Sequence, residues 1–299
     1  MKIFIAFVIM ILLLSGCAAV AYGDEKTPDD RLKIITTAFP LYDFTRNIAG
    51  DKMQVAMLFP LGADKHTYEP TPHDIIKIKE SGLLIYVGGA SDNWAGKISE
   101  NSLKLADSVL LFGDNSCSHN RRHLNFDEHI WTSPKNAILM VEAVSGALIA
   151  LDRENADFYR QNADDYIKEL EELDNTFLEI ISEAERDTII FADRFAFRYF
   201  TEAYGLEYYA SFPNCAEQAE PSALTMAFLI EKIKDEKIPA VFYGELSDKK
   251  IASTIVRETG AEALLLHSCH TVSQEELDGG IGYIELMRRN AEALRRALT

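Results

Sequence analysis

The layout of the chain is decided by the stretch ENADFYRQNADDYIKELEELDNTFLEIISEAE, residues Glu154–Glu185. It runs for about nine helical turns without glycine or proline. Its apolar positions make a thin stripe on a densely charged helix: Phe158, Tyr166, Leu170, Leu173, Phe177 and Ile181. A helix this long with so narrow a stripe is typical of a connector that crosses between two lobes. A coiled-coil arm is the alternative, but these positions do not keep a clean heptad.

Short apolar strands alternate with helical patterns on both sides of this helix. The expected strands before it are Lys33–Phe39, Val55–Phe59, Leu83–Val87 and Val109–Phe112. Those after it are Thr188–Phe191, Leu206–Ala210, Ala240–Tyr243 and Ala263–Leu266. Such strands, separated by helices, indicate parallel sheets covered on both faces. The predicted fold class is therefore α/β, with two lobes, each a mostly parallel sheet flanked by helices, joined by one long rigid helix.

These patterns also predict the domain boundaries. We expect an N-terminal α/β lobe over residues 32–151, the linking helix over 152–186 and a C-terminal α/β lobe over 187–299. Within the first lobe, a helix is expected at Asp74–Ser81, with Thr71 as its cap and Pro72 at its first position.

The first residues predict export. Lys2 precedes an apolar run, Ile3–Leu14, that is too short to span a bilayer as a mature helix. The following Leu-Ser-Gly-Cys resembles a bacterial lipobox, which predicts a signal peptide over residues 1–16, a lipid on Cys17 and a flexible tether over 17–31. The alternative is an ordinary secretory signal cut near Ala21. Both interpretations place the protein outside the cytoplasm, and the first anchors it to the bacterial cell membrane.

Net charge and missing motifs exclude several functions. The formal net charge of -17 should repel nucleic acid and anionic membrane surfaces. It suits cationic ligands, although solubility alone is an equally good explanation. The sequence contains no H-E-x-x-H, no G-x-S-x-G and no phosphate-binding G-x-x-x-x-G-K-[ST] motif. We therefore do not expect an enzyme.

Four of the seven histidines follow expected strands. These are His66, His129, His267 and His270. In open α/β sheets, ligands bind beyond the carboxyl ends of the strands, so histidines from both lobes are expected to meet there. Neutral imidazole is a common metal ligand and suits zinc, whereas carboxylates move the preference towards manganese. The pattern predicts a metal site in the cleft between the lobes.

Several motifs in the same order resemble those of a known family. They are PLGADKHTYEPTP (Pro60–Pro72), DEHIWTSP (Asp127–Pro134), AFRYF (Ala196–Phe200) with YGL (Tyr204–Leu206), AEPS (Ala219–Ser222) and ETGA (Glu258–Ala261). The chain resembles the zinc/manganese substrate-binding lipoproteins of ABC transporters from about Lys33 to Leu298. The resemblance implies an interlobe site for Zn²⁺ or Mn²⁺ as transported ligand. It also implies delivery to an ABC transporter permease, without nucleic acid, by what we expect to be a monomer.

The resemblance also implies ligand positions. His66 and His129 match the first two, whereas the third is occupied by Arg194, a cation that cannot coordinate metal. The adjacent Asp193 could substitute for it. The last position maps to His270 or His267, depending on the gap. The expected ligands are His66, His129, Asp193 and His270, with His267 in reserve as a ligand or as support for one, and Glu245 as a further possible carboxylate.

Two cysteines lie in loops near the expected cleft. A disulfide between Cys215 and Cys269 would brace the second lobe, whereas thiolate ligation by either would favour zinc. The function expected from all these features is reversible metal capture for an ABC importer, with zinc favoured over manganese. The alternative is a metal-stabilised surface adhesin or interaction lipoprotein.

Overall fold

The computed structural model describes residues 30–63, 65–113, 126–212 and 220–299. The chain divides into two compact units, Met1–Arg31 and Leu32–Thr299. All helices and strands described below belong to the second unit. The expected signal peptide, tether and lipidated Cys17 lie outside the described residues.

The first sheet lies in the N-terminal half and is parallel throughout. Its strands are β1 (Lys33–Thr36), β2 (Gln54–Met57), β3 (Leu83–Tyr86) and β4 (Ser102–Lys104), in the order β2-β1-β3-β4. In the central strand, Ile34 is paired with Val55 on one side and Leu83 on the other. The carboxyl ends of these strands therefore meet at one edge of the sheet.

Four α-helices accompany this sheet. They are α2 (Phe39–Ala49), α3 (Pro72–Lys79), α4 (Ala95–Ile98) and α5 (Pro134–Leu151), with 3₁₀ turns η1 (Lys65–Thr67), η2 (Leu105–Ser108) and η3 (Ile130–Thr132). Thr71 caps α3 as expected, because its hydroxyl accepts from the Asp74 amide and the Asp74 carboxylate accepts from the Thr71 amide. Among the described residues, α5 is the helix with the length and apolar composition to cross a bilayer, but here it packs against α6, α2 and η3.

The second sheet lies in the C-terminal half and is also parallel. It contains β5 (Thr188–Arg194), β6 (Glu207–Phe212), β7 (Ala240–Tyr243) and β8 (Glu262–Leu265), in the order β6-β5-β7-β8. Its helices are α7 (Arg198–Tyr204), α8 (Ala223–Glu236), α9 (Lys250–Thr259), α10 (Gln274–Asp278) and α11 (Tyr283–Leu298). The two sheets and their helices form the two lobes, and the predicted fold class is confirmed.

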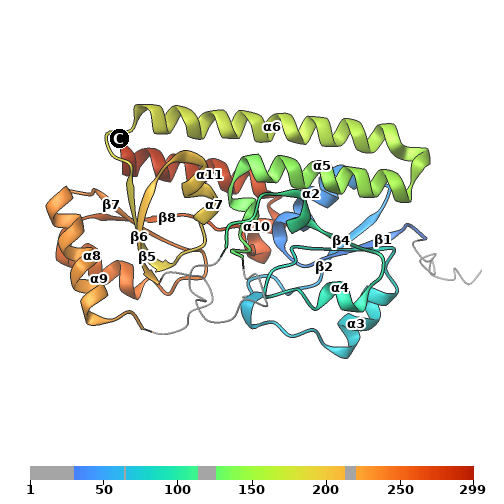
Figure 1. Ribbon diagram of the computed structural model, residues 1–299, viewed down its shortest axis with the longest axis horizontal. Coiled ribbons are helices and arrows are strands. Elements are labelled where there is room, and N and C mark those ends of the chain that lie inside the picture. Colours follow the sequence, from blue (N-terminus) through green and yellow to red (C-terminus); the bar gives the residue numbers. More distant parts are fainter. Residues whose placement is uncertain (1–29, 64, 114–125, 213–219) are drawn as a thin grey trace, which may run out of the picture. The chain divides into compact units, whose positions relative to one another are not determined.

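The long connector is a short turn, η4 (Arg153–Asn155), followed by α6 (Ala156–Glu183). Figure 1 shows α6 running past both lobes, and it packs against α2 and α5 of the first lobe and α11 of the second. Its buried stripe is Tyr159, Ala163, Tyr166, Leu170, Leu173, Phe177 and Ile180. The charged remainder faces outward, as the sequence pattern predicted, but Phe158 of the expected stripe is 36% exposed and Tyr159 is buried instead.

Each sheet is covered on both faces. One continuous core joins both sheets to α2, α5, α6 and α11, and it includes Ile34, Ile85, Ile189 and Phe191. Alternate residues of the same strands pack on the opposite faces, Ile35 and Leu84 in the first lobe and Ile190 and Val241 in the second. This shared core joins the two lobes to each other. The loops that follow the strands lie outside it and are available to form a site.

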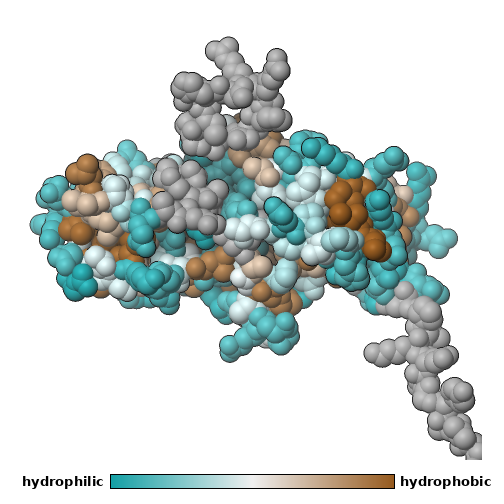
Figure 2. Space-filling model, turned by 90° about the horizontal axis from the view of Figure 1, so that it is seen from below, coloured by the Kyte–Doolittle hydropathy of each residue, from teal (hydrophilic) through white to brown (hydrophobic). Residues whose placement is uncertain are grey.

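One expected strand is wrong. Val109–Phe112 follows η2 as irregular chain, and Leu110 in this run is 78% exposed. The fourth strand is instead β4, an edge strand of three residues whose Ser102 and Lys104 give little apolar signal. Figure 2 shows one face of the molecule as largely hydrophilic, with apolar residues in separate patches, which agrees with the charged composition.

Candidate metal centre

Three histidines from distant parts of the chain converge. His66 lies in η1 after β2, His129 directly precedes η3, and His270 follows β8. One ligand nitrogen from each lies within 4.8 Å of the other two. His129 and His270 are buried and the His66 side chain is 10% exposed. The first and second lobes therefore both contribute imidazoles to one small volume.

The closest pair crosses between the lobes. Nε2 of His129 lies 2.8 Å from Nε2 of His270, and the ring centroids are 4.4 Å apart. The ring of His66 lies 5.6 Å from that of His129 and 5.1 Å from that of His270, measured between centroids. All three rings thus surround a common point.

The other ring nitrogen of His129 is bound to a carboxylate. Oδ1 of Asp127 lies 2.6 Å from Nδ1 of His129 and also accepts from the His129 amide at 2.9 Å. Burial alone would raise the pKa of the Asp127 carboxyl, but the charge and hydrogen bonds of His129 hold that pKa below its usual value. An ionised Asp127 places the proton on Nδ1, so that Nε2 carries the lone pair that a metal requires.

The ring of His270 is held through a serine. Ser268 donates its hydroxyl to Oε1 of Glu245 at 2.6 Å, so its oxygen accepts from Nδ1 of His270 at 2.7 Å. Glu245 also accepts from the amides of Ser268 and His270, at 2.9 and 3.2 Å. This network fixes both the loop and the tautomer, and it again leaves Nε2 as the donor to an ion.

A carboxylate supports the third histidine as well. Oε1 of Glu128 lies 3.2 Å from Nδ1 of His66, and Ser91 donates its hydroxyl to Oε2 of the same carboxylate. Gly89 packs so closely here that a Cβ at its position would lie 2.4 Å from Cβ of Glu128. A carboxylate therefore orients each of the three imidazoles, directly at His66 and His129 and through Ser268 at His270.

This arrangement fits a tetrahedral divalent ion after a small adjustment. Zinc binds imidazole nitrogen at about 2.0–2.1 Å, which separates two nitrogens of a tetrahedral site by about 3.4 Å. The Nε2 atoms of His129 and His270, at 2.8 Å, must move apart slightly, and the more distant nitrogen must approach. The donor type, neutral imidazole throughout, suits zinc.

Contacts between the lobes hold the two sides of the site together. The indole of Trp131, which is fully buried, donates to the carbonyl of Ser268 at 2.8 Å, and Tyr283 donates its hydroxyl to the carbonyl of Trp131 at 2.5 Å. The amide of Gly62 donates to the hydroxyl of Thr271 at 2.8 Å. The loops that carry the histidines are therefore tied to each other by hydrogen bonds of the protein itself.

Replacing Trp131 with phenylalanine should weaken zinc binding. The variant keeps an aromatic ring but loses the donor to Ser268, two residues before His270, so the alignment of His129 with His270 is no longer fixed. Loss of a group that orients a ligand costs about 10–100-fold in metal affinity, and we expect about tenfold here. Competition with a chromophoric chelator measures it.

Tyr159→Phe is the matched control for this variant. It also keeps the aromatic ring and loses one donor, to the Asp152 carboxylate at 2.6 Å, but between α6 and the end of α5 rather than beside a histidine. We expect its zinc affinity to stay near that of the wild type. Equal losses in both variants would show that Trp131 has no special role.

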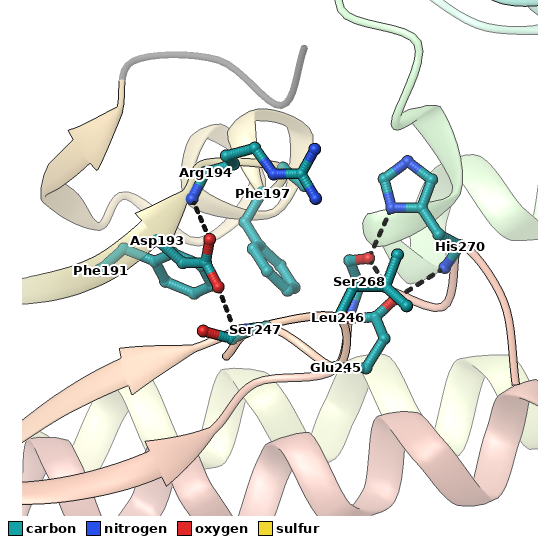
Figure 3. Close-up of a pocket in the computed structure, with 11 residues that line it drawn as sticks. Phe191, Asp193, Arg194, Phe197, Glu245, Leu246, Ser247, Ser268 and His270 are labelled. Carbon is teal, nitrogen blue, oxygen red and sulfur yellow. Dashed lines mark hydrogen bonds between the residues drawn. The ribbon is translucent and has the colours of Figure 1, made fainter. Parts of the chain in front are cut away.

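Asp193 and Arg194 lie across a cavity from His270. The carboxylate of Asp193 accepts from the Arg194 amide at 2.8 Å and the Gly244 amide at 3.4 Å. Figure 3 shows the hydrogen bonds of this carboxylate and the guanidinium of Arg194 pointing towards the imidazole of His270. The structure therefore does not bring Asp193 into the histidine group.

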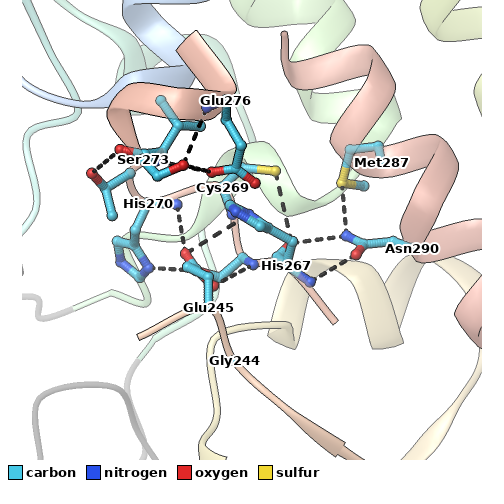
Figure 4. Close-up of polar contacts among 12 residues, drawn as sticks. Gly244, Glu245, His267, Cys269, His270, Ser273, Glu276, Met287 and Asn290 are labelled. Atoms are coloured by element: carbon cyan, nitrogen blue, oxygen red, sulfur yellow. Dashed lines mark hydrogen bonds and ion pairs between the residues drawn. The ribbon is translucent and has the colours of Figure 1, made fainter. Parts of the chain in front are cut away.

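His267 also stands apart from the group. Its amide donates to Oδ1 of Asn290 at 2.7 Å, its carbonyl accepts from Nδ2 of Asn290 at 2.8 Å, and its Nδ1 accepts from the Cys269 amide at 2.9 Å. Figure 4 shows these contacts beside Glu245. In this conformation His267 supports the loop that carries His270.

Cys269 is buried, and burial raises the pKa of its thiol well above the usual value. Its backbone has a positive φ of 60°, in the left-handed region. The expected partner Cys215 lies outside the described residues, so the disulfide between them stays a prediction.

Sequence reasoning missed the groups that orient the rings. Asp127 and Glu128 stand directly before His129, and a carboxylate beside a metal-binding histidine is a recognisable signal. Glu245 was expected as a possible ligand, but both of its oxygens bind the loop of Ser268. No local pattern could have paired these two residues, because 23 positions separate them.

Comparison of sequences gives one family and many relatives. Residues 34–297 match the model of the family described as zinc-uptake complex component A, periplasmic. The zinc-binding lipoprotein AdcA of Streptococcus pneumoniae strain R6 is 31% identical over 304 residues, covering 96% of this chain but only 60% of AdcA. The high-affinity zinc uptake system protein ZnuA of Bacillus subtilis strain 168 is 29% identical over 303 residues, covering 96% of this chain and 94% of ZnuA.

Solved structures show the same architecture. The metal-dependent lipoprotein YcdH from Bacillus subtilis superposes with a TM-score of 0.79 at 29% identity, covering 90% of this chain and 100% of that chain. The Zn(II)-bound ZnuA-like domain of Streptococcus pneumoniae AdcA gives a TM-score of 0.77 at 29% identity, covering 90% and 99%. The likeness thus extends over both lobes and the linking helix.

Proposed function

The chain belongs to the family of zinc-uptake complex component A, and on that premise we propose that it is the metal-capturing component of an ABC importer. It binds one divalent transition-metal ion between its lobes, zinc in preference to manganese, and delivers it to a permease. The observation that carries this proposal is the convergence of His66, His129 and His270 from both lobes.

The donor set supports zinc. The described group offers three imidazole nitrogens, whereas Asp127, Glu128 and Glu245 are engaged in orienting the rings or their loops. Imidazole is a good ligand for zinc, and manganese prefers sites richer in carboxylate oxygen. Two similar proteins, AdcA and ZnuA, carry zinc in their names.

The mechanism is reversible capture without chemical turnover. The ion exchanges water for the lone pairs of the three histidines, and the lobes close slightly around it. Asp193 lies outside the group of converging nitrogens, and Nδ1 of His267 accepts from the Cys269 amide, so the proposed ligands are the three converging histidines. Protons compete for the same lone pairs, so acid favours release.

Export and anchoring belong to the same proposal. A lipid on Cys17 would hold the protein at the outer face of the cell membrane, near its permease, as a monomer. The similar proteins AdcA of Streptococcus pneumoniae and YcdH of Bacillus subtilis are both described as lipoproteins. Loss of lipid labelling in a Cys17→Ser variant tests this anchor.

Metal analysis with chelation tests the function itself. Protein purified without added metal should carry about one zinc per chain, and a chelator should remove it while the circular dichroism spectrum stays unchanged. The site should survive because the loops are held by bonds such as Trp131 to Ser268 and Gly62 to Thr271. Unfolding of a lobe on chelation would instead favour a structural metal, as expected for the adhesin alternative.

A further inference from the structure

A second cavity lies in the C-terminal lobe, between β8, the loop that follows it, and the helices α10 and α11. Its volume is about 300 Å³, at the small end of the range of ligand pockets. Leu264, Leu286 and Ala293 give it an apolar wall, and its described lining residues exclude the three converging histidines. The cavity is therefore separate from the metal centre and large enough for a small molecule.

A buried histidine supplies this cavity with a hydrogen-bond donor. His267 lines the cavity and is 3% exposed, and Asn290 binds both its amide and its carbonyl. Because Nδ1 of His267 accepts from the Cys269 amide at 2.9 Å, the neutral ring carries its proton on Nε2. In the described part of the chain, the structure records no acceptor for this N–H. A ligand in the cavity can therefore receive a hydrogen bond from a donor that is already fixed in place.

Two side chains of opposite charge line the cavity beside this donor. Oε2 of Glu276 accepts from the amide and the hydroxyl of Ser273, at 2.9 and 2.8 Å. Arg289 donates from Nε to Glu285 at 3.2 Å, which uses one of its five N–H donors. Burial alone would raise the pKa of Glu276, but the hydrogen bonds of Ser273 and the charges of His267 and Arg289 hold that pKa below its usual value. The carboxylate is therefore ionised and lies within electrostatic reach of the other two groups.

The charges around the cavity balance one another. Besides Glu276 and Arg289, its lining contains one further carboxylate and one further guanidinium, those of Glu292 and Arg296. Both of these residues are exposed, and Arg296 donates to Glu262 at the surface. A ligand with a net charge would leave one sign of this lining unmatched, whereas a zwitterion with an apolar body complements both the charges and the leucines.

We propose that this cavity binds a small apolar α-amino acid. The carboxylate of the amino acid accepts from Nε2 of His267 and from the guanidinium of Arg289, and its ammonium group donates to Glu276. Its side chain lies against Leu264 and Leu286. This inference goes beyond the proposed function, because the cavity shares no described lining residue with the group of converging histidines.

Calorimetric titration of the protein with three related probes tests the inference. L-Leucine is compared with 4-methylpentanoate, which lacks the amino group, and with 3-methylbutylamine, which lacks the carboxylate. Leucine should bind at least about tenfold more tightly than either analogue, because each analogue loses a charge-assisted contact. Either analogue binding as tightly as leucine, or no binding of leucine at millimolar concentration, would overturn the inference.

A pair of neighbouring arginines in α11 provides the variant and its control. Arg289→Gln should weaken leucine binding by about tenfold. Arg288→Gln should leave it unchanged, because Arg288 pairs with Glu169 and does not line the cavity, although the two side chains are similarly exposed, at 51% for Arg288 and 53% for Arg289. Equal leucine affinity in the two variants would contradict the proposed role of Arg289. The titration requires no zinc, so a negative result would leave the proposed function intact.

Discussion

Replacing His129 with alanine lowers the affinity for zinc by about a thousandfold. The change removes one of three nitrogen donors, the one that lies 2.8 Å from Nε2 of His270. It also leaves Asp127, held ionised by His129, without its partner beside the site. Loss of an orienting group alone costs about 10–100-fold, so loss of the donor itself should exceed that range. Chelator competition at neutral pH measures the affinity.

Two histidine variants are compared with His129→Ala, and the first of them is its control. His73→Ala removes an exposed imidazole at the start of α3 and should leave zinc affinity unchanged. His267→Asn removes the reserve candidate, and since that ring supports the loop of His270, we expect a loss of about 10–100-fold. Wild-type zinc affinity in His129→Ala would contradict a histidine site shared between the lobes.

Replacing Asp43 with alanine should cost about 3–5 kcal/mol of the free energy of unfolding. Asp43 is 1% exposed in α2 and accepts from the hydroxyl of Tyr166 in α6 at 2.8 Å and from the amide of Tyr283 at the start of α11 at 3.0 Å. It also pairs with Arg46 at 3.2 Å. One carboxylate thus joins both lobes to the linking helix. Its removal leaves the buried hydroxyl of Tyr166 and the buried amide of Tyr283 without their acceptor, which is costly.

Urea unfolding followed by circular dichroism measures this loss. Asp51→Ala is the matched control, because the Asp51 side chain is 80% exposed and its ion pair with Lys52, at 3.5 Å, lies at the surface. Its free energy of unfolding should change by less than about 0.5 kcal/mol. A similarly small change in Asp43→Ala would show that the buried carboxylate contributes nothing to the union of the lobes.

The fold could be predicted well where the sequence pattern was long or terminated clearly. The linking helix was expected at Glu154–Glu185 and is found at Ala156–Glu183, because its length and charged surface allow few other structures. The strand Ala240–Tyr243 and the Thr71 cap agree with the structure residue for residue. Each of these rests on side chains that act within a few positions of the chain.

Prediction failed where tertiary contacts decided the outcome. The sequence pattern predicts Phe39 as the end of a strand rich in β-branched residues. In the structure it begins α2, with Pro40 in the first turn. The apolar run Val109–Phe112 looks like a strand, yet the sheet ends with the short, polar β4. A single sequence does not show which short segment finds a partner at the edge of a sheet.

The same distinction holds for the residues of the candidate site: local patterns predicted some of them, and tertiary contacts decided the others. Position after a strand indicated the edge where His66 and His270 lie, since parallel strands end together. His129 also meets them there, but the strand expected before it, Val109–Phe112, is not formed. Adjacency to Arg194 suggested Asp193 as a ligand, but its carboxylate binds two backbone amides instead. Whether a side chain turns towards a cleft or towards its own backbone depends on neighbours that are distant in sequence.

Anomalous diffraction at the zinc edge, from crystals of the protein loaded with one equivalent of zinc, tests the central claim most directly. The account predicts one strong peak at about 2.0–2.1 Å from Nε2 of His66, His129 and His270 together. A zinc peak elsewhere, or one bound by fewer than these three rings, would contradict it.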